Sequence, residues 1–129
     1  MLSDLAISPA IPASDMDRAK KFYEETLGLE PGESSGEAGQ YYNCGAGTRL
    51  FLYQSSYAGP KEATAAGWRV YENFDAVVDY LRNRGVVFEE YDFPGFKTEE
   101  GVIRNPDGSM AAWFKDTEGN ILSIDYLGD

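Results

Sequence analysis

The sequence predicts a single α+β domain, residues 1–129, made of two similar βαβββ modules. Three observations carry this prediction. Two amphipathic helix patterns begin 58 residues apart, at Asp15 and Asn73. Each pattern ends at a glycine, Gly28 or Gly85, and short apolar runs separated by turn residues follow it. Two such modules are typical of a cupped, largely antiparallel mixed sheet that carries its helices on the outside and a pocket on the concave side.

The first module is predicted over residues 1–58. Its opening apolar run, residues 5–12, is typical of an edge strand, because the prolines within it cannot donate a hydrogen bond to a neighbouring strand. Asp15 is a good helix N-cap, and apolar residues recur behind it at three- and four-residue spacing as far as Gly28. Two further strands are expected at 40–44 and 49–54, joined by a Gly-Ala-Gly turn.

The second module is predicted over residues 63–129. Its helix begins at Asn73 and ends at Gly85, with arginines in the last turn, where they complement the helix dipole. Strands are expected at 86–91, 110–114 and 121–126, and turns at 105–108 and 117–120. The segment 92–101 is expected to be a loop near the pocket.

Charge and composition restrict the partners and the chemistry. With 11 basic and 22 acidic residues the net charge is −11, which disfavours nucleic acid and anionic membranes and favours neutral or cationic small molecules. No segment predicts a membrane span or a signal peptide, and the lone Cys44 favours a reducing, cytoplasmic setting. The chain has no histidine, which excludes Ser-His-Asp and Cys-His catalysis and removes the usual nitrogen ligand for zinc, iron or nickel.

Three segments together resemble the vicinal-oxygen-chelate superfamily, the glyoxalase, bleomycin-resistance and extradiol-dioxygenase type. Residues 15–23 with Leu-Gly-Leu at 27–29 resemble its first-helix signature, and 73–85 is similar to its second-helix segment. Residues 113–120 resemble the turn before its last strand. The resemblance implies two βαβββ modules around a small-molecule site, usually in a homodimer. In the family's enzymes it also implies a divalent metal held by four side chains, mostly His and Glu.

The resemblance assigns those four metal-ligand positions to side chains that bind metals poorly. They fall at Ser8, at Phe51 or Tyr53, at Ala66 and at Ser123. A serine hydroxyl binds a divalent cation weakly, whereas alanine and phenylalanine do not bind one at all. The sequence therefore predicts a member of the family that lacks its usual metal ligands, with no metal and no cofactor.

Aromatic side chains are expected to line the pocket instead. Phe51 and Tyr53 share one face of a strand by its two-residue period, and Trp68 shares the face of Ala66. Such rings bind flat apolar or cationic ligands, although filling the core is the alternative interpretation. Trp113 is assigned to the core.

Asp125 is expected beside Ser123 on the polar face of the last strand. Its carboxylate is predicted to pair with a cationic group of a ligand or to act as a general base with the hydroxyl of Tyr53. A solvated carboxylate near the end of the chain is the alternative.

Three functions follow from these predictions. The preferred one is a metal-independent protein that binds an aromatic or cationic small molecule. The alternatives are a metal-free enzyme that uses Asp125 with Tyr53 as acid and base, and a metal-dependent lyase, isomerase or dioxygenase with a carboxylate site drawn from Asp125 and Glu72. The predicted ligand-binding residues are Ser8, Phe51, Tyr53, Ala66, Trp68, Ser123 and Asp125.

Overall fold

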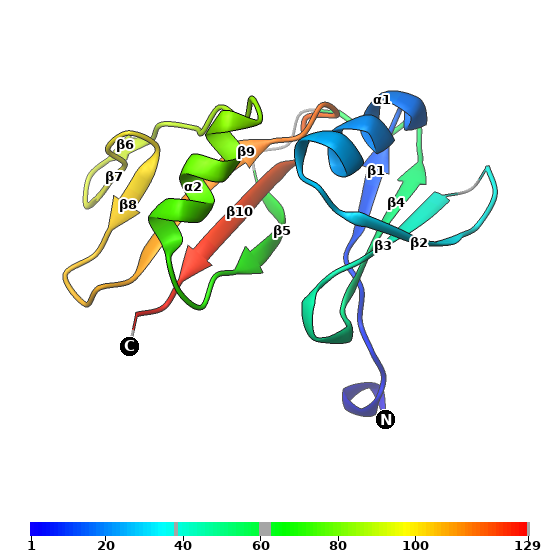
Figure 1. The fold of residues 1–129 in the computed structure, drawn as a ribbon, viewed down its shortest axis with the longest axis horizontal. Coiled ribbons are helices and arrows are strands. Elements are labelled where there is room, and N and C mark those ends of the chain that lie inside the picture. The colour runs from blue at the N-terminus through cyan, green and yellow to red at the C-terminus, as the bar shows by residue number, and fades with distance from the viewer. Residues whose placement is uncertain (38, 60–62, 129) are drawn as a thin grey trace.

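The N-terminal half of the chain forms a four-stranded sheet in the order β1-β4-β3-β2, with its helix on one face (Figure 1). The structure is a computed structural model that describes residues 1–37, 39–59 and 63–128. The outer strand β1 pairs in parallel with β4, and the other pairings are antiparallel. The elements are a 3-10 turn (Leu2–Asp4), β1 (Ala10–Ala13), α1 (Met16–Lys21) with a π-helical turn (Phe22–Thr26), β2 (Glu30–Ser34), β3 (Gly39–Asn43), a short turn (Gly45–Gly47) and β4 (Arg49–Gln54).

The C-terminal half repeats this arrangement with the sheet order β5-β10-β9-β8. Here β5 pairs in parallel with β10, as β1 does with β4. A small two-stranded hairpin is inserted between the helix and β8. The elements are β5 (Thr64–Arg69), α2 (Phe74–Asn83), β6 (Asp92–Phe93), β7 (Phe96–Lys97), β8 (Val102–Arg104), β9 (Met110–Lys115) and β10 (Ile121–Tyr126).

The predicted fold class is confirmed, and several of its predicted details are present. The Asp15 carboxylate accepts a hydrogen bond from the backbone N–H of Arg18 at 3.0 Å and so caps α1. Gly28 and Gly85 follow the two helices with φ of 74° and 95°, the left-handed conformation that ends a helix. Asn73 precedes α2 as predicted, but it has φ 59° and its side chain makes no capping hydrogen bond. None of the described helices is long and apolar enough to cross a membrane.

Three predicted elements are wrong in their extent or type. The predicted strand 86–91 makes only an isolated bridge, between Phe88 and Phe114, because β8 occupies most of that edge of β9. The predicted loop 92–101 contains the β6–β7 hairpin. The predicted strand 5–12 begins only at Ala10, since the parallel ladder with β4 starts there.

The β9–β10 turn joins the two halves through Asp116. Its carboxylate accepts hydrogen bonds from the Tyr23 hydroxyl at 2.7 Å and from the Asn120 side-chain amide at 2.8 Å. It also accepts from the backbone N–H groups of Glu118 and Asn120, both at 2.8 Å. Tyr23 is fully buried, and burial together with Asp116 raises its pKa, so its hydroxyl stays a donor. A fully satisfied carboxylate thus holds the core tyrosine of one half to the last turn of the other.

Glu118, two residues further along the same turn, lies against the start of α1. Its side chain is 0% exposed and accepts from Arg18 Nε at 2.8 Å. The backbone N–H groups of Ser14 and Asp15 donate to it at 3.1 and 3.2 Å. Burial alone would raise the pKa of Glu118, but the hydrogen bonds from Arg18, Thr117 and Asp15 outweigh it and lower the pKa to about 2. We call the Asp116 and Glu118 contacts together the clasp.

The clasp predicts a loss of stability in acid. The pKa of Glu118 lies below its usual 4.5, so its ionised form stabilises the folded state above about pH 4.5. That contribution, about 3 kcal/mol, is expected to disappear as the pH falls toward 2. Urea unfolding between pH 7 and pH 2.5 measures it. Glu118→Gln should be less stable than the native chain at pH 7, and its free energy of unfolding should fall less steeply as the pH is lowered. An equally steep fall would assign the acid sensitivity to other carboxylates.

Candidate functional site

Strand alternation divides the N-terminal sheet into a face under the helix and a free face. In β4, Leu50 and Leu52 are at most 2% exposed and belong to the core, whereas Phe51 and Tyr53 are half-buried and point to the other side. Ala10 of β1 is the register partner of Phe51 and so belongs to the free face. Ser8 lies two residues before Ala10, so the two-residue period of a strand assigns it to the same face.

Three aromatic rings cover this free face. The ring centroids of Tyr41 and Phe51 are 4.6 Å apart, and those of Phe51 and Tyr53 are 6.0 Å apart with an angle of 8° between the planes. The guanidinium of Arg49 lies 3.9 Å from the centroid of Tyr41. The Phe51 ring lies directly over Gly39, which has no side chain to displace it. These rings form a continuous, half-exposed aromatic surface.

The C-terminal sheet has a free face of different chemistry. Ser123 in β10 lies between Trp113 in β9 and Gly67 in β5, and all three are in register. An added Cβ at Gly67 would lie 2.3 Å from Ser123 Oγ, so the serine hydroxyl occupies the space above this glycine. The neighbouring pair on this face is an ion pair, with Arg69 Nε 3.1 Å from the Asp125 carboxylate.

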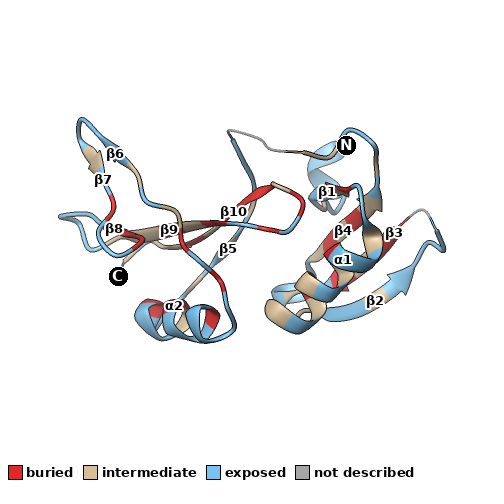
Figure 2. Ribbon diagram, turned by 90° about the horizontal axis from the view of Figure 1, so that it is seen from above, coloured by how far each residue is buried: buried red, intermediate tan, exposed pale blue. Residues whose placement is uncertain are grey.

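The β6–β7 hairpin and the adjacent Tyr91 add three aromatic rings to this second face. Figure 2 shows the hairpin on the side of the sheet opposite α2. Its Phe96 ring lies 5.4 Å from Trp113, and the adjacent Tyr91 ring lies 5.7 Å from the same indole. Burial and the charge of Glu89 raise the pKa of Tyr91, so its ring stays neutral. A depression of about 280 Å³ opens here, lined by Thr64, Tyr91, Phe93, Phe96, Trp113 and Ile121.

The assignment of Trp113 to the core is therefore wrong, because Trp113 lies half-buried on the free face. Its strand reads Met-Ala-Ala-Trp-Phe, with apolar residues on both alternating faces, so the two-residue period could not show which face of the sheet Trp113 lies on. The register with Ser123 would have placed it, but register is not visible in a single sequence.

Ala66 and Trp68 lie on the helix side of the C-terminal sheet, apart from Ser123. Their register partners are Leu122 and Ile124, which are buried under α2. A register shift between Ile121 and Leu122 moves this part of β5 by one residue, so Gly67 takes the place that the sequence assigned to Ala66.

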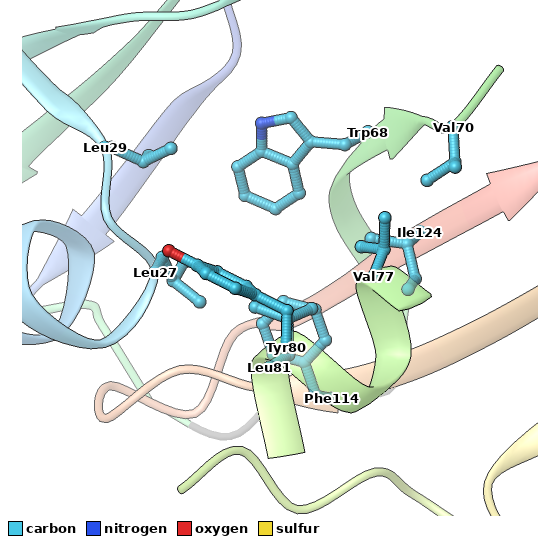
Figure 3. A pocket seen from close by; sticks show the side chains of 9 residues that line it. All are labelled: Leu27, Leu29, Trp68, Val70, Val77, Tyr80, Leu81, Phe114 and Ile124. Carbon is cyan, nitrogen blue, oxygen red and sulfur yellow. The ribbon is translucent and has the colours of Figure 1, made fainter. Parts of the chain in front are cut away.

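Trp68 lines a separate cleft of about 220 Å³ between the two halves (Figure 3). Leu27 and Leu29 bound this cleft from the N-terminal half, and Tyr80 and Val77 of α2 bound it from the other. The structure thus places five of the seven predicted ligand-binding residues on the two free faces, Trp68 in this cleft and Ala66 on the helix side of β5.

Among the residues that the structure describes, the two free faces belong to separate sheets, and the depression beside Trp113 is lined by the second face alone. The two halves meet on their helix-bearing sides, where the Arg84 guanidinium donates to the backbone carbonyls of Thr26 and Glu25 at 2.8 and 2.7 Å. The free faces therefore point outward, away from the helices (Figure 2). In the part of the chain that the structure describes, β1 and β5 are outer strands of their sheets and pair on one side only.

Residues 7–124 match the profile of the Glyoxalase/Bleomycin resistance protein/Dioxygenase superfamily. The chain belongs to this superfamily. A search of curated proteins gave no match.

Solved structures share the fold of this chain at low sequence identity. A glyoxalase/bleomycin resistance protein/dioxygenase from Alicyclobacillus acidocaldarius has a TM-score of 0.74 and 20% identity, covering 98% of this chain and 93% of that one. A variant of the fosfomycin resistance protein FosX from Listeria monocytogenes, complexed with Mn(II), gives 0.69 and 17%, covering 100% and 93%. TnmS3, an antibiotic-binding protein from a Streptomyces species, gives 0.63 and 25%, covering 95% and 96%.

The residues at the superfamily's metal-ligand positions do not fit a divalent cation. On the free faces they supply the hydroxyls of Ser8 and Ser123, the rings of Phe51 and Tyr53, and Gly67 in place of Ala66. The nearest carboxylate in β10, Asp125, is paired with Arg69. Among the described residues no group of three or more His, Cys, Asp or Glu side chains is placed to hold a metal ion.

Proposed function

We propose that this superfamily member is a metal-independent protein that binds flat aromatic small molecules, neutral or cationic, on its free faces. One observation carries the proposal: strand register turns Tyr41, Phe51, Tyr53 and Trp113 away from the helices, where they remain half-buried. Rings that fill a core are covered, whereas half-exposed rings on a sheet supply area for stacking with a ligand.

The proposed site is completed by a second copy of the chain. In one chain the Phe51 face and the Trp113 face point outward, so neither encloses a ligand. The outer strands β1 and β5 each offer an unpaired edge among the described residues, and exposed edges are the usual place for sheet-to-sheet association. A homodimer joined at these edges brings the Phe51 face of one copy opposite the Trp113 face of the other and forms a concave site between the two faces.

The charge and the relatives support this class of ligand. The net charge of −11 favours neutral or cationic ligands over anionic ones. Among similar structures, TnmS3 is an antibiotic-binding protein, and its likeness to this chain covers 96% of its length. We expect the protein in the cytoplasm, since Cys44 is a free cysteine.

The acid–base alternative has less support from the geometry. The Asp125 carboxylate, which would act as the base, is held by the Arg69 guanidinium at 3.1 Å. Glu72, the other carboxylate predicted for a metal site, is exposed in the connection between β5 and α2.

The two tryptophans provide a direct test, because one lies on the free face and the other in the cleft. Trp68→Phe leaves Trp113 as the only indole, and Trp113→Phe leaves Trp68. Titration with 9-aminoacridine, a cationic flat aromatic, and with anthraquinone, a neutral one, is expected to quench Trp113 in the first variant and to leave Trp68 unquenched in the second. Quenching confined to Trp68, or no quenching with either compound, would contradict the proposal.

Removal of the opposite aromatic surface is expected to weaken the same binding. Phe51→Ala deletes the central ring of the N-terminal free face and should raise the Kd for 9-aminoacridine about tenfold, the equivalent of about 1.4 kcal/mol. Tyr71→Ala is the matched control, since Tyr71 is 84% exposed outside both sheets and should leave the Kd unchanged. Equal affinities for the two variants would remove Phe51 from the site.

A further inference from the structure

The cleft between the two halves is an apolar surface that the proposed ligand site does not use. Its lining residues come from β5, α2, β9, β10 and the segments beside them, and Figure 3 shows Trp68 and Tyr80 facing Leu27 and Leu29 across it. Tyr80 is 48% exposed, and Trp68 is half-buried. Among the described residues, none that lines the cleft is charged, which favours an apolar occupant.

A second apolar surface lies at the start of the chain. Leu2, Leu5 and Ile7 are 82%, 63% and 89% exposed. The backbone hydrogen bond from Phe51 N to Pro9 O at 2.9 Å is where this segment joins the sheet, and Figure 1 shows it extending beyond the sheet from there. We call residues 2–8 the arm. Three large aliphatic side chains in so short an exposed segment are typical of a contact with another surface.

We propose that the arm of one copy packs into the cleft of a second copy. The inference rests on the proposed function in one respect, namely that β1 and β5 of different copies meet. The arm leads directly into β1, and Trp68 of β5 lies in the wall of the cleft. The apolar arm thereby reaches a surface next to β5 that, among the described residues, no charged side chain lines.

The direction of the strands decides where the arm goes. If β1 lies antiparallel to β5 of the other copy, the arm continues past the end of β5 that carries Trp68 and leads to Val70, which also lines the cleft. A parallel arrangement would carry the arm toward Thr64 instead, at the opposite end of β5. The proposal therefore commits to the antiparallel arrangement.

Cross-linking between copies that carry different single cysteines tests the proposal. In a Cys44→Ser background, Ile7→Cys protein is mixed with Val70→Cys protein and treated with a short bismaleimide. The expected product is a two-chain species that requires both variants. Glu90→Cys replaces Val70→Cys in the control mixture, because Glu90 is exposed beyond β9, on the side of the sheet away from β5, and it should give no such product.

Two other outcomes would overturn the proposal. A double variant, Ile7→Cys with Val70→Cys, that cross-links within one chain while the mixture does not would show that the arm covers its own cleft. No cross-link in either sample would show that the arm lies elsewhere. The mass from light scattering and the quenching of Trp113, both measured on the protein with its native arm, separate these results from failure of the proposed function. A dimer that binds 9-aminoacridine but gives no cross-link would overturn only the arm proposal. A monomer whose Trp113 is not quenched would overturn the ligand site.

Discussion

Asp116→Ala is expected to destabilise the folded protein by about 4 kcal/mol, because a buried hydrogen-bond network loses its central acceptor. Four donors lose their partner, namely the Tyr23 hydroxyl, the Asn120 amide and two backbone N–H groups. Tyr23 is 0% exposed, so its hydroxyl cannot turn to water without opening the core. Thermal and urea unfolding measure the loss, with a fall in Tm of about 10–15 °C.

Asp107→Ala is the matched control for this prediction. Asp107 stands in the equivalent turn before β9 and accepts hydrogen bonds from the backbone and side chain of Ser109 at 2.9 and 2.7 Å. Those donors are exposed, so water replaces the lost acceptor and the cost should stay below about 1 kcal/mol. If the two substitutions cost the same, burial of the Asp116 network would not be what holds the halves together.

The sequence predicted those parts of the fold that depend on local chemistry. Asp15 could be identified as a helix cap because a short carboxylate before an amphipathic run satisfies the first N–H groups of the helix, and the structure shows that bond. The strands at 49–54 and 121–126 were predicted with the bounds that the structure gives, since their apolar residues follow a clear pattern bounded by turns. The clasp was not predicted, because its donors and acceptors lie about 100 positions apart in the chain.

The candidate site depends on register, which the sequence does not reveal. Phe51 and Tyr53 could be assigned to one face because a period of two holds within a strand. Whether Ala66 or Gly67 faces Ser123 depends on a single shift between β5 and β10, and that shift moved Trp68 from the expected pocket to the cleft. Trp113 lies beside Phe96 of the β6–β7 hairpin. Each strand of this hairpin has only two residues, which is too short for a periodic pattern to predict it.

Gly39→Ala is expected to disrupt the ligand face through the fold itself. The added Cβ would lie 2.5 Å from the backbone oxygen of Leu52 and 2.5 Å from Phe51 Cζ, and non-bonded Cβ atoms do not approach other atoms so closely. The Phe51 ring can turn away, but the Leu52 oxygen belongs to the β3–β4 ladder, so the strand must shift as well. Overpacking of this kind costs about 1–3 kcal/mol. The displaced ring should also raise the Kd for 9-aminoacridine at least as much as Phe51→Ala does.

A double variant separates these two consequences of Gly39→Ala. In Gly39→Ala with Phe51→Ala the ring contact is absent, while the contact with the Leu52 oxygen remains. Stability losses that fall short of additive would measure the share due to the ring, whereas fully additive losses would assign the strain to the strand. Gly45→Ala is the control, because nothing lies within 4 Å of its added Cβ, and it should change neither stability nor binding. Unchanged binding by Gly39→Ala at reduced stability would mean that the position of the Phe51 ring does not matter to the ligand, and the aromatic face would lose its role in the proposed site.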